Sequence, residues 1–244
     1  MDVHHHPELP HGKKKHFKEY FLEFLMIFLA VTMGFIAENL REHISDRSKE
    51  TDYITGMIKN LEVDTASLKK IIINNRLQIG GIDTLRSISR NKLDEVKVQD
   101  SLYKYTITYL FSADEFKNDD ITLSQLRNGG GYRLIRNESV LDSIEVYESN
   151  IQFINSQSTY FLDHLGKTID FSGSIFDLNS GGKFESAPSS TPMLITKDKE
   201  KIYNFYNDCF MLSTSLKGYN NMLRNHLKYS TRLIAYLKKE YNIE

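Results

Sequence analysis

The chain lacks the features that define several common protein classes. Among its 244 residues there is a single cysteine, Cys209, so an intramolecular disulfide is excluded. The formal net charge is only -1, which leaves no strong electrostatic attraction for nucleic acid. We therefore expect neither a disulfide-stabilised scaffold nor a nucleic-acid partner.

Proline is also scarce. The 4 prolines lie in two stretches, at Pro7 and Pro10 and at Pro188 and Pro192. The absence of proline between these stretches favours long helices, and no segment alternates as a strand does. The content of 40% hydrophobic and 26% charged residues is that of a globular protein, with enough chain for one sizeable core.

Catalytic motifs are missing as well. The sequence contains no H-E-x-x-H, no G-x-S-x-G, no dinucleotide-type glycine fingerprint and no C-x-x-C. The run from Asn128 to Gly131 lacks the Gly-Lys-Ser/Thr of a phosphate loop and predicts a turn between helices. His226 has no obvious ligand partner one turn away and is expected to be a structural or a surface histidine. We predict a protein that is not an enzyme and that needs no cofactor.

What the sequence does contain is a long apolar run near its N-terminus. Phe24 to Ala37 is interrupted only by Thr32, and Tyr20 to Leu40 would span about 30 Å as a helix. A cleaved signal peptide or a buried core helix would give a similar run. Phe35 occupies a position where signal-peptide cleavage favours a small residue, which argues for a retained anchor. We predict a transmembrane helix over residues 20–40.

The orientation of this helix is predicted from the basic residues on its two sides. Lysines stand at positions 13, 14, 15 and 18 before it, and Arg41, Arg47 and Lys49 follow it. The small excess places the basic, histidine-rich tail of residues 1–19 in the cytoplasm. The remainder would then lie in the periplasm, anchored in the inner (cytoplasmic) membrane.

One face of the predicted span combines a carboxyl group with small residues. Helical spacing aligns five positions, namely Glu23, Ile27, Ala30, Gly34 and Ala37. Ala30 and Gly34 form a small-xxx-small pair, which lets another helix approach closely. We expect this face to pack against a second copy or another membrane protein. The alternative is that Glu23 reaches water or Lys18 at the interface.

The rest of the chain predicts an all-α fold with an antiparallel helical bundle. Residues 41–52 are charged and predict a helical stalk, and the soluble domain is expected over 53–244. An apolar track runs along the first long helix (Leu40, Ile44, Ile54, Ile58, Leu61, Leu68 and Ile72), which is expected to end at Gly80-Gly81. Shorter helices are predicted over 82–90, 94–111 and 121–127.

Two further long helices complete the prediction. Asn137 is a suitable N-cap for a helix with the stripe Val140, Ile144, Tyr147, Ile151 and Ile154, ending near Leu165 before Gly166. The last helix, over 198–241, carries an apolar track made of Ile202, Cys209, Leu212, Leu216, Tyr219, Leu223, Leu233 and Leu237. Cys209 is on this track, so its thiol is expected to be buried and inert. An irregular loop is expected at about 170–199, partly packed through Phe171, Ile175, Phe176 and Phe184.

The one histidine cluster is in the N-terminal tail. His4, His5 and His6, with His11 and His16 nearby, could bind a transition metal weakly, and an expression tag would look similar. A flexible tail at the membrane surface is the favoured explanation. We predict no metal centre.

Several blocks resemble a family of uncharacterised single-span proteins common in Bacteroidota. They are the HHHP tail at residues 4–7, the EYFLEFLMIFLAVTMGF span, and LRNGGGYRLIRN near the middle. The resemblance implies an inner-membrane anchor and a helical extracytoplasmic domain, and it implies no reaction. Together with the missing motifs it predicts a non-enzymatic scaffold, accessory or interaction protein of an envelope complex. The alternative is a ligand-sensing helical domain that signals through a membrane partner.

Overall fold

A computed structural model describes residues 17–178 and 193–244. Within these residues there are five α-helices, two short 3-10 helices and no strand. The helices are α1 (Phe17–Ser87), α2 (Val96–Leu110), α3 (Ile121–Asn128), α4 (Glu138–Ser172) and α5 (Lys199–Tyr241), with η1 (Arg90–Lys92) and η2 (Gly131–Leu134) between them. The predicted all-α class is confirmed. The chain divides into two compact units at Lys49/Glu50, and α1 contributes to both.

In the first unit, the N-terminal part of α1 is helical and exposed. It contains a segment long and apolar enough to cross a membrane, and none of that segment is buried in the structure. Large side chains such as Phe24, Met33 and Phe35 are more than 60% exposed. This exposure contradicts the alternative of a buried core helix. Leu40 and Ile44, the first two positions of the predicted apolar track, are exposed as well.

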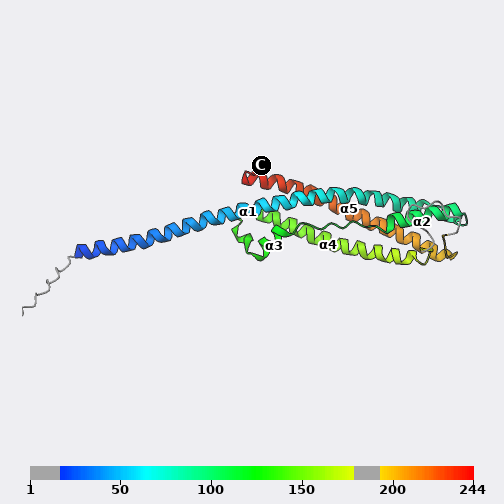
Figure 1. Ribbon diagram of the computed structural model, residues 1–244, viewed down its shortest axis with the longest axis horizontal. Helices are drawn as coiled ribbons and strands as arrows, with labels where there is room; N and C mark the ends of the chain where they lie inside the picture. The colour runs from blue at the N-terminus through cyan, green and yellow to red at the C-terminus, as the bar shows by residue number, and fades with distance from the viewer. Residues whose placement is uncertain (1–16, 179–192) are drawn as a thin grey trace, which may run out of the picture. The chain divides into compact units, whose positions relative to one another are not determined.

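In the second unit, three long helices run lengthwise beside one another (Figure 1). The part of α1 from Glu50 onward is antiparallel to α5, since Tyr241 Oη donates to Glu50 Oε1 at 2.6 Å while Lys217 pairs with Asp83 at 2.7 Å. α4 runs in the same direction as α1, because its start lies beside Glu50, whose Oε1 accepts the backbone N–H of Arg136 at 3.0 Å. The three helices therefore form an up-up-down arrangement.

The fourth position of the bundle is filled by α2, an extended segment at 111–120, and α3. Figure 1 shows this extended segment running between the labels of α2 and α3. Hydrogen bonds from α1 follow its course, with Gln78 at the α2 end, Asp64 further along and Asn60 at the start of α3. The chain thus returns along α1 with a stretch of non-helical backbone in place of a fourth long helix.

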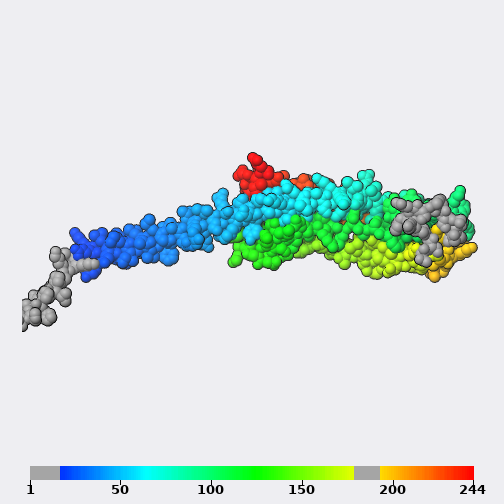
Figure 2. All heavy atoms as spheres, viewed as in Figure 1, coloured from blue at the N-terminus to red at the C-terminus, as the bar shows by residue number. Residues whose placement is uncertain are grey.

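The core of this unit is built from the predicted stripes. All five apolar positions predicted on α4 are buried, and so are those predicted on α5 (Ile202, Cys209, Leu212, Leu216, Tyr219, Leu223, Leu233 and Leu237). Side chains fill the gaps between the ribbons on the face that Figure 2 shows. Burial of these side chains at about 25 cal/mol per Å² of apolar surface is the main stabilising contribution to the bundle.

The predicted end of the first long helix is wrong. α1 continues through Gly80-Gly81 to Ser87, so residues 82–90 do not form a separate helix. A Cβ atom at Gly81 would overlap the ring of Tyr109 on α2. The glycine therefore serves close packing between two helices and does not act as a C-terminal cap.

The predicted end of the α4 helix near Leu165 is also wrong, since α4 continues to Ser172. Gly166 is tolerated within the helix because buried residues on either side, Leu165 and Thr168, hold the next turn in the core. The N-terminal cap is confirmed: Asn137 Oδ1 accepts the backbone N–H of Ser139 at 3.0 Å. The predicted turn at 128–131 is present, with Gly130 at φ 67°.

The irregular connection after α4 packs in part, as predicted. Ile175 and Phe176 are buried, and the backbones of Ile195 and Ile175 are joined by a hydrogen bond of 3.0 Å. Phe171 is partly buried against the same core, whereas Phe184 lies outside the described residues. Cys209 is buried as predicted.

Candidate functional site

The five positions of the predicted helix-packing face lie in the exposed, apolar part of α1. Glu23, Ile27, Ala30, Gly34 and Ala37 are all in the helix and all exposed. A Cβ atom at Gly34 would meet nothing within 4 Å. The one polar interruption, Thr32, donates its hydroxyl to the backbone oxygen of Phe28 at 2.8 Å, which satisfies that group within the helix as a lipid environment requires.

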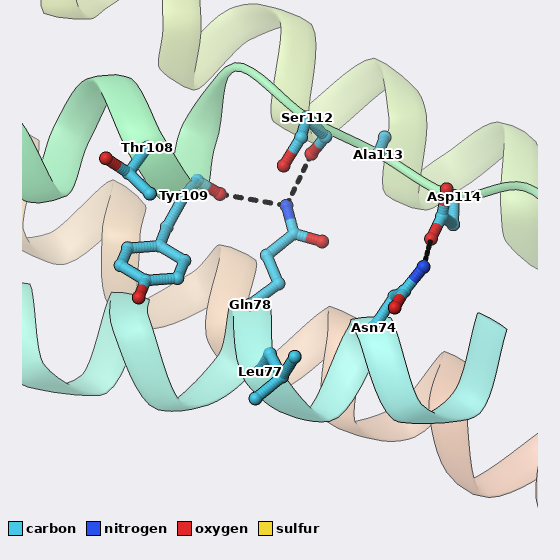
Figure 3. A pocket seen from close by; sticks show the side chains of 8 residues that line it. All are labelled: Asn74, Leu77, Gln78, Thr108, Tyr109, Ser112, Ala113 and Asp114. Atoms are coloured by element: carbon cyan, nitrogen blue, oxygen red, sulfur yellow. Dashed lines mark hydrogen bonds between the residues drawn. The ribbon is translucent and has the colours of Figure 1, made fainter. Parts of the chain in front are cut away.

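A second candidate site lies at the surface of the bundle, where side chains of α1 bind the extended segment. The amide of Gln78 donates to the backbone oxygens of Tyr109 and Ser112 at 2.9 and 2.6 Å, and Asn74 Nδ2 donates to Asp114 at 2.7 Å. Figure 3 shows both side chains reaching from α1 toward this segment. They line a surface cavity of about 300 Å³. The extended backbone has no helical partners, so these side chains take their place.

Two further side chains of α1, nearer to α3, also bind the backbone of the returning chain. Asp64 Oδ1 accepts the backbone N–H of Asp119 at 2.8 Å, and Asn60 Oδ1 accepts that of Thr122 at 3.1 Å. From α5, the hydroxyl of Tyr219 accepts the N–H of Phe116 at 3.1 Å. Asn60, Asp64 and Tyr219 therefore bind backbone N–H groups that helical hydrogen bonds do not satisfy.

The other oxygen of the Asp64 carboxylate connects this layer to α4. It accepts a hydrogen bond from the phenol of Tyr147, which is buried. Burial raises the pKa of Asp64, while the hydrogen bonds from Tyr147 and from the Asp119 backbone oppose that rise. Burial and the nearby carboxylate raise the pKa of Tyr147, so the tyrosine remains a protonated donor.

His226 on α5 lies against this pair. Its ring stacks on Tyr147 with centroids 5.0 Å apart and lies 5.8 Å from the ring of Phe116. The side chain is 3% exposed, and neither ring nitrogen has a hydrogen-bond partner among the described residues. Burial lowers the pKa of His226 to about 4, so the ring is neutral near pH 7. Of the two roles expected for this histidine, structural or surface, its burial among aromatic rings supports the structural one.

The other side of His226 borders a groove between α4 and α5. The groove has a volume of about 340 Å³ and is lined by uncharged side chains, namely Asn150, Phe153, Ile154, Met222, Asn225, His226 and Tyr229. Phe153 at its rim is 55% exposed. The groove can accept uncharged, partly apolar groups, and it holds no charged residue that would bind an ion.

Two features of the described residues argue against a metal site and against a cysteine nucleophile. In the parts of the chain that the structure describes, no three His, Cys, Asp or Glu side chains gather as metal ligands. Burial raises the pKa of the Cys209 thiol to about 12, which keeps it protonated and unreactive. The histidines at positions 4, 5 and 6 lie outside the described residues.

The polar row on α1 was missed by an interpretation that followed apolar residues only. Asn60, Asp64 and Gln78 recur at helical spacing with the apolar core positions Leu68 and Ile71. A polar residue repeatedly placed on the buried face of a helix is the signal that could have revealed it, because buried polar groups need partners. The partner itself, an extended segment, has no comparable sequence signal.

Comparison of the chain with protein-family models, with curated proteins and with solved structures gives no match.

Proposed function

We propose that this protein is a non-enzymatic, membrane-anchored interaction protein, acting as a scaffold or accessory subunit of a bacterial envelope complex. The observation that carries the proposal is the N-terminal part of α1, whose apolar segment is long enough to cross a membrane and is entirely exposed. Exposed apolar surface of that extent needs a nonpolar surrounding. A lipid bilayer supplies it.

The proposed topology follows from the charges beside this segment. Four lysines precede it at positions 13, 14, 15 and 18, against three basic residues that follow closely. In the proposal the N-terminus is cytoplasmic, the span crosses the inner membrane, and the bundle is periplasmic. The exposed face with Ala30 and Gly34 contacts another membrane helix.

The chemistry of the bundle supports binding in preference to catalysis. Its buried titratable groups are held in unreactive forms: the Cys209 thiol has its pKa raised to about 12 and His226 has its pKa lowered to about 4. The Asp64 carboxylate is occupied by a backbone N–H and a phenol. These buried groups stabilise the folded bundle, and a partner protein can recognise the surface of that bundle.

The proposal is tested by isolating the full chain from membranes in mild detergent and identifying co-purifying proteins by mass spectrometry. A partner in fixed stoichiometry, or a second copy of the chain, is the expected result. Recovery of the protein alone as a monomer would contradict the proposal.

Ligand sensing is the second candidate function, and the groove beside His226 favours it. The groove lies between two bundle helices and offers the amides of Asn150 and Asn225 next to apolar side chains. A sensor would bind a small uncharged molecule there as a monomer. A widened groove, for example in the variant Phe153→Ala, should then change ligand binding without changing the set of co-purifying proteins.

A further inference from the structure

α4 presents a row of uncharged side chains along its surface. Val146, Asn150, Phe153, Gln157 and Tyr160 follow one another in steps of four and three residues, so they share one face of the helix. Val146, Phe153 and Tyr160 are 47%, 55% and 60% exposed. This row lies beside the buried stripe and is separate from it, because the core positions Tyr147 and Ile154 fall one residue further along.

α5 presents a matching row. Ser215, Gly218, Met222, Asn225 and Tyr229 repeat the same spacing, and none is charged. The antiparallel register of the two helices is fixed by the Tyr147–His226 stack and by the hydrogen bond from Tyr229 Oη to Ser143 O at 2.8 Å. In this register the two rows lie side by side, and members of both line the groove of about 340 Å³.

Two adjacent rows of five positions each without a charge stand out on this protein, since 26% of its residues are charged. A face with exposed aromatic and apolar side chains and no charge has the composition of an interface centre. Each row also has the four-three spacing with which helices pack against one another in bundles. The face is therefore suited to two further helices.

The charges beside the rows identify the kind of helix that fits. α4 contains six acidic residues and one lysine, whereas α5 contains eight lysines and arginines and three acidic residues. Asp142, one turn before Val146, and Glu145 lie at the N-terminal end of the α4 row, and Lys228 and Arg232 lie at the neighbouring end of the α5 row. All four are exposed, and within the described chain none of them forms an ion pair.

We propose that this face, the α4–α5 face, is where two copies of the chain associate. A two-fold axis parallel to the helices places α4 of each copy beside α5 of the other, antiparallel, so that the four helices form one bundle. The uncharged rows meet at its centre. Asp142 and Glu145 of one copy then lie near Lys228 and Arg232 of its partner, with opposite charges facing each other.

The inference deepens the proposed function by naming the partner, and it rests on the proposed interaction role. Anchoring in one membrane would further favour association by raising the local concentration of the chains. A dimer formed in this way covers the groove beside His226, so a small ligand and a second copy exclude each other there.

Charge reversal on the full chain in mild detergent tests the proposal. The first variant, Asp142→Lys/Glu145→Lys, makes both flanks basic, and the second, Lys228→Glu/Arg232→Glu, makes both acidic. Each is expected to weaken self-association about tenfold or more, because like charges then face each other. Mixed together, the two variants are expected to form a heterodimer, since every facing pair is again opposite in charge.

The measurement is the mass of the particle by light scattering, with two different affinity tags to detect the heterodimer. The control is Lys69→Glu/Lys70→Glu, which reverses two exposed lysines on α1 and should leave the dimer intact. Circular dichroism establishes that all variants are folded. Variants that self-associate like the wild type, or that fail to pair when mixed, would overturn the proposal.

The two-copy proposal and the proposed interaction role can be wrong independently, and the experiments distinguish the two cases. A monomeric wild-type chain that still co-purifies with another protein overturns the two-copy proposal and leaves the interaction role standing. A monomer that co-purifies with nothing overturns both. A monomer that binds a small uncharged molecule in the groove favours the sensing alternative.

Discussion

The phenol of Tyr147 on α4 donates a hydrogen bond to the Asp64 carboxylate on α1, whose other oxygen accepts the backbone N–H of Asp119. One carboxylate thus joins two long helices and the extended segment that replaces a fourth. Asp64 is 1% exposed, so each of these donors compensates the cost of burying it.

Removal of the phenol hydroxyl should destabilise the bundle. In Tyr147→Phe the buried carboxylate loses a donor, and the free energy of unfolding is expected to fall by about 1–3 kcal/mol. Urea unfolding of the full chain in mild detergent measures the change. Tyr203→Phe is the control, because Tyr203 is exposed and its loss of a hydroxyl should cost less than about 0.5 kcal/mol. Equal effects of the two substitutions would contradict the role assigned to Tyr147.

His226 should make the stability of the bundle depend on pH. Burial lowers its pKa from 6.5 to about 4 in the folded chain, so the unfolded chain binds more protons between these values. Above about pH 6.5 the neutral ring causes no loss of stability. As the pH falls toward 4, the free energy of unfolding is expected to decrease by about 2–3 kcal/mol. The variant His226→Phe should lack this part of the dependence.

The measurement is unfolding at several pH values between 7 and about 4 for the wild type and for His226→Phe. Above pH 7 the variant should be as stable as the wild type or more stable, since it buries no unpartnered ring nitrogen. If the free energy of unfolding changed with pH in the same way for both proteins, the lowered pKa of His226 would be contradicted.

Much of the fold is predictable because its long helices bury regular stripes. On α5 the apolar track from Ile202 to Leu237 is continuous, and every predicted position is buried. Helical periodicity identifies such an element directly, and the capping side chain of Asn137 identifies the start of α4 in the same way.

The errors arise where tertiary packing overrides a local signal. Gly80-Gly81 has the composition of a helix end, but the ring of Tyr109 occupies the space beside Gly81 and the helix continues. The return of the chain along α1 as extended backbone depends on Asn60, Asp64 and Gln78, which are distant in sequence from the segment they hold. The α4–α5 face also emerges only when the register of the two helices is known.

Gln78 should control the mobility of the extended segment. The variant Gln78→Leu removes the hydrogen bonds to Tyr109 and Ser112, and amide hydrogen exchange at Phe116 and Asp119 is expected to speed up about tenfold or more. Arg76→Leu, at an exposed position on the same helix, is the matched control and should leave exchange unchanged. Unchanged exchange in Gln78→Leu would mean that the segment is held by other contacts.

The small-residue face of the membrane segment should determine where helices meet in the bilayer. Single cysteines at Ala30 and Gly34 are expected to cross-link between chains or to a partner in membranes more efficiently than cysteines at Phe28 and Phe35, which lie on the other side of α1. The buried Cys209 should not react. Cross-linking of equal efficiency around the helix would contradict the predicted face.

The central claim is that the N-terminal helix is a retained membrane anchor. Its most direct test is the intact mass of the native protein after membranes are washed with alkaline carbonate. We expect a protein in the membrane pellet whose mass shows that the apolar segment from Tyr20 to Leu40 is still part of the chain. A chain released into the supernatant, or one shortened by cleavage after the apolar segment, would contradict the account.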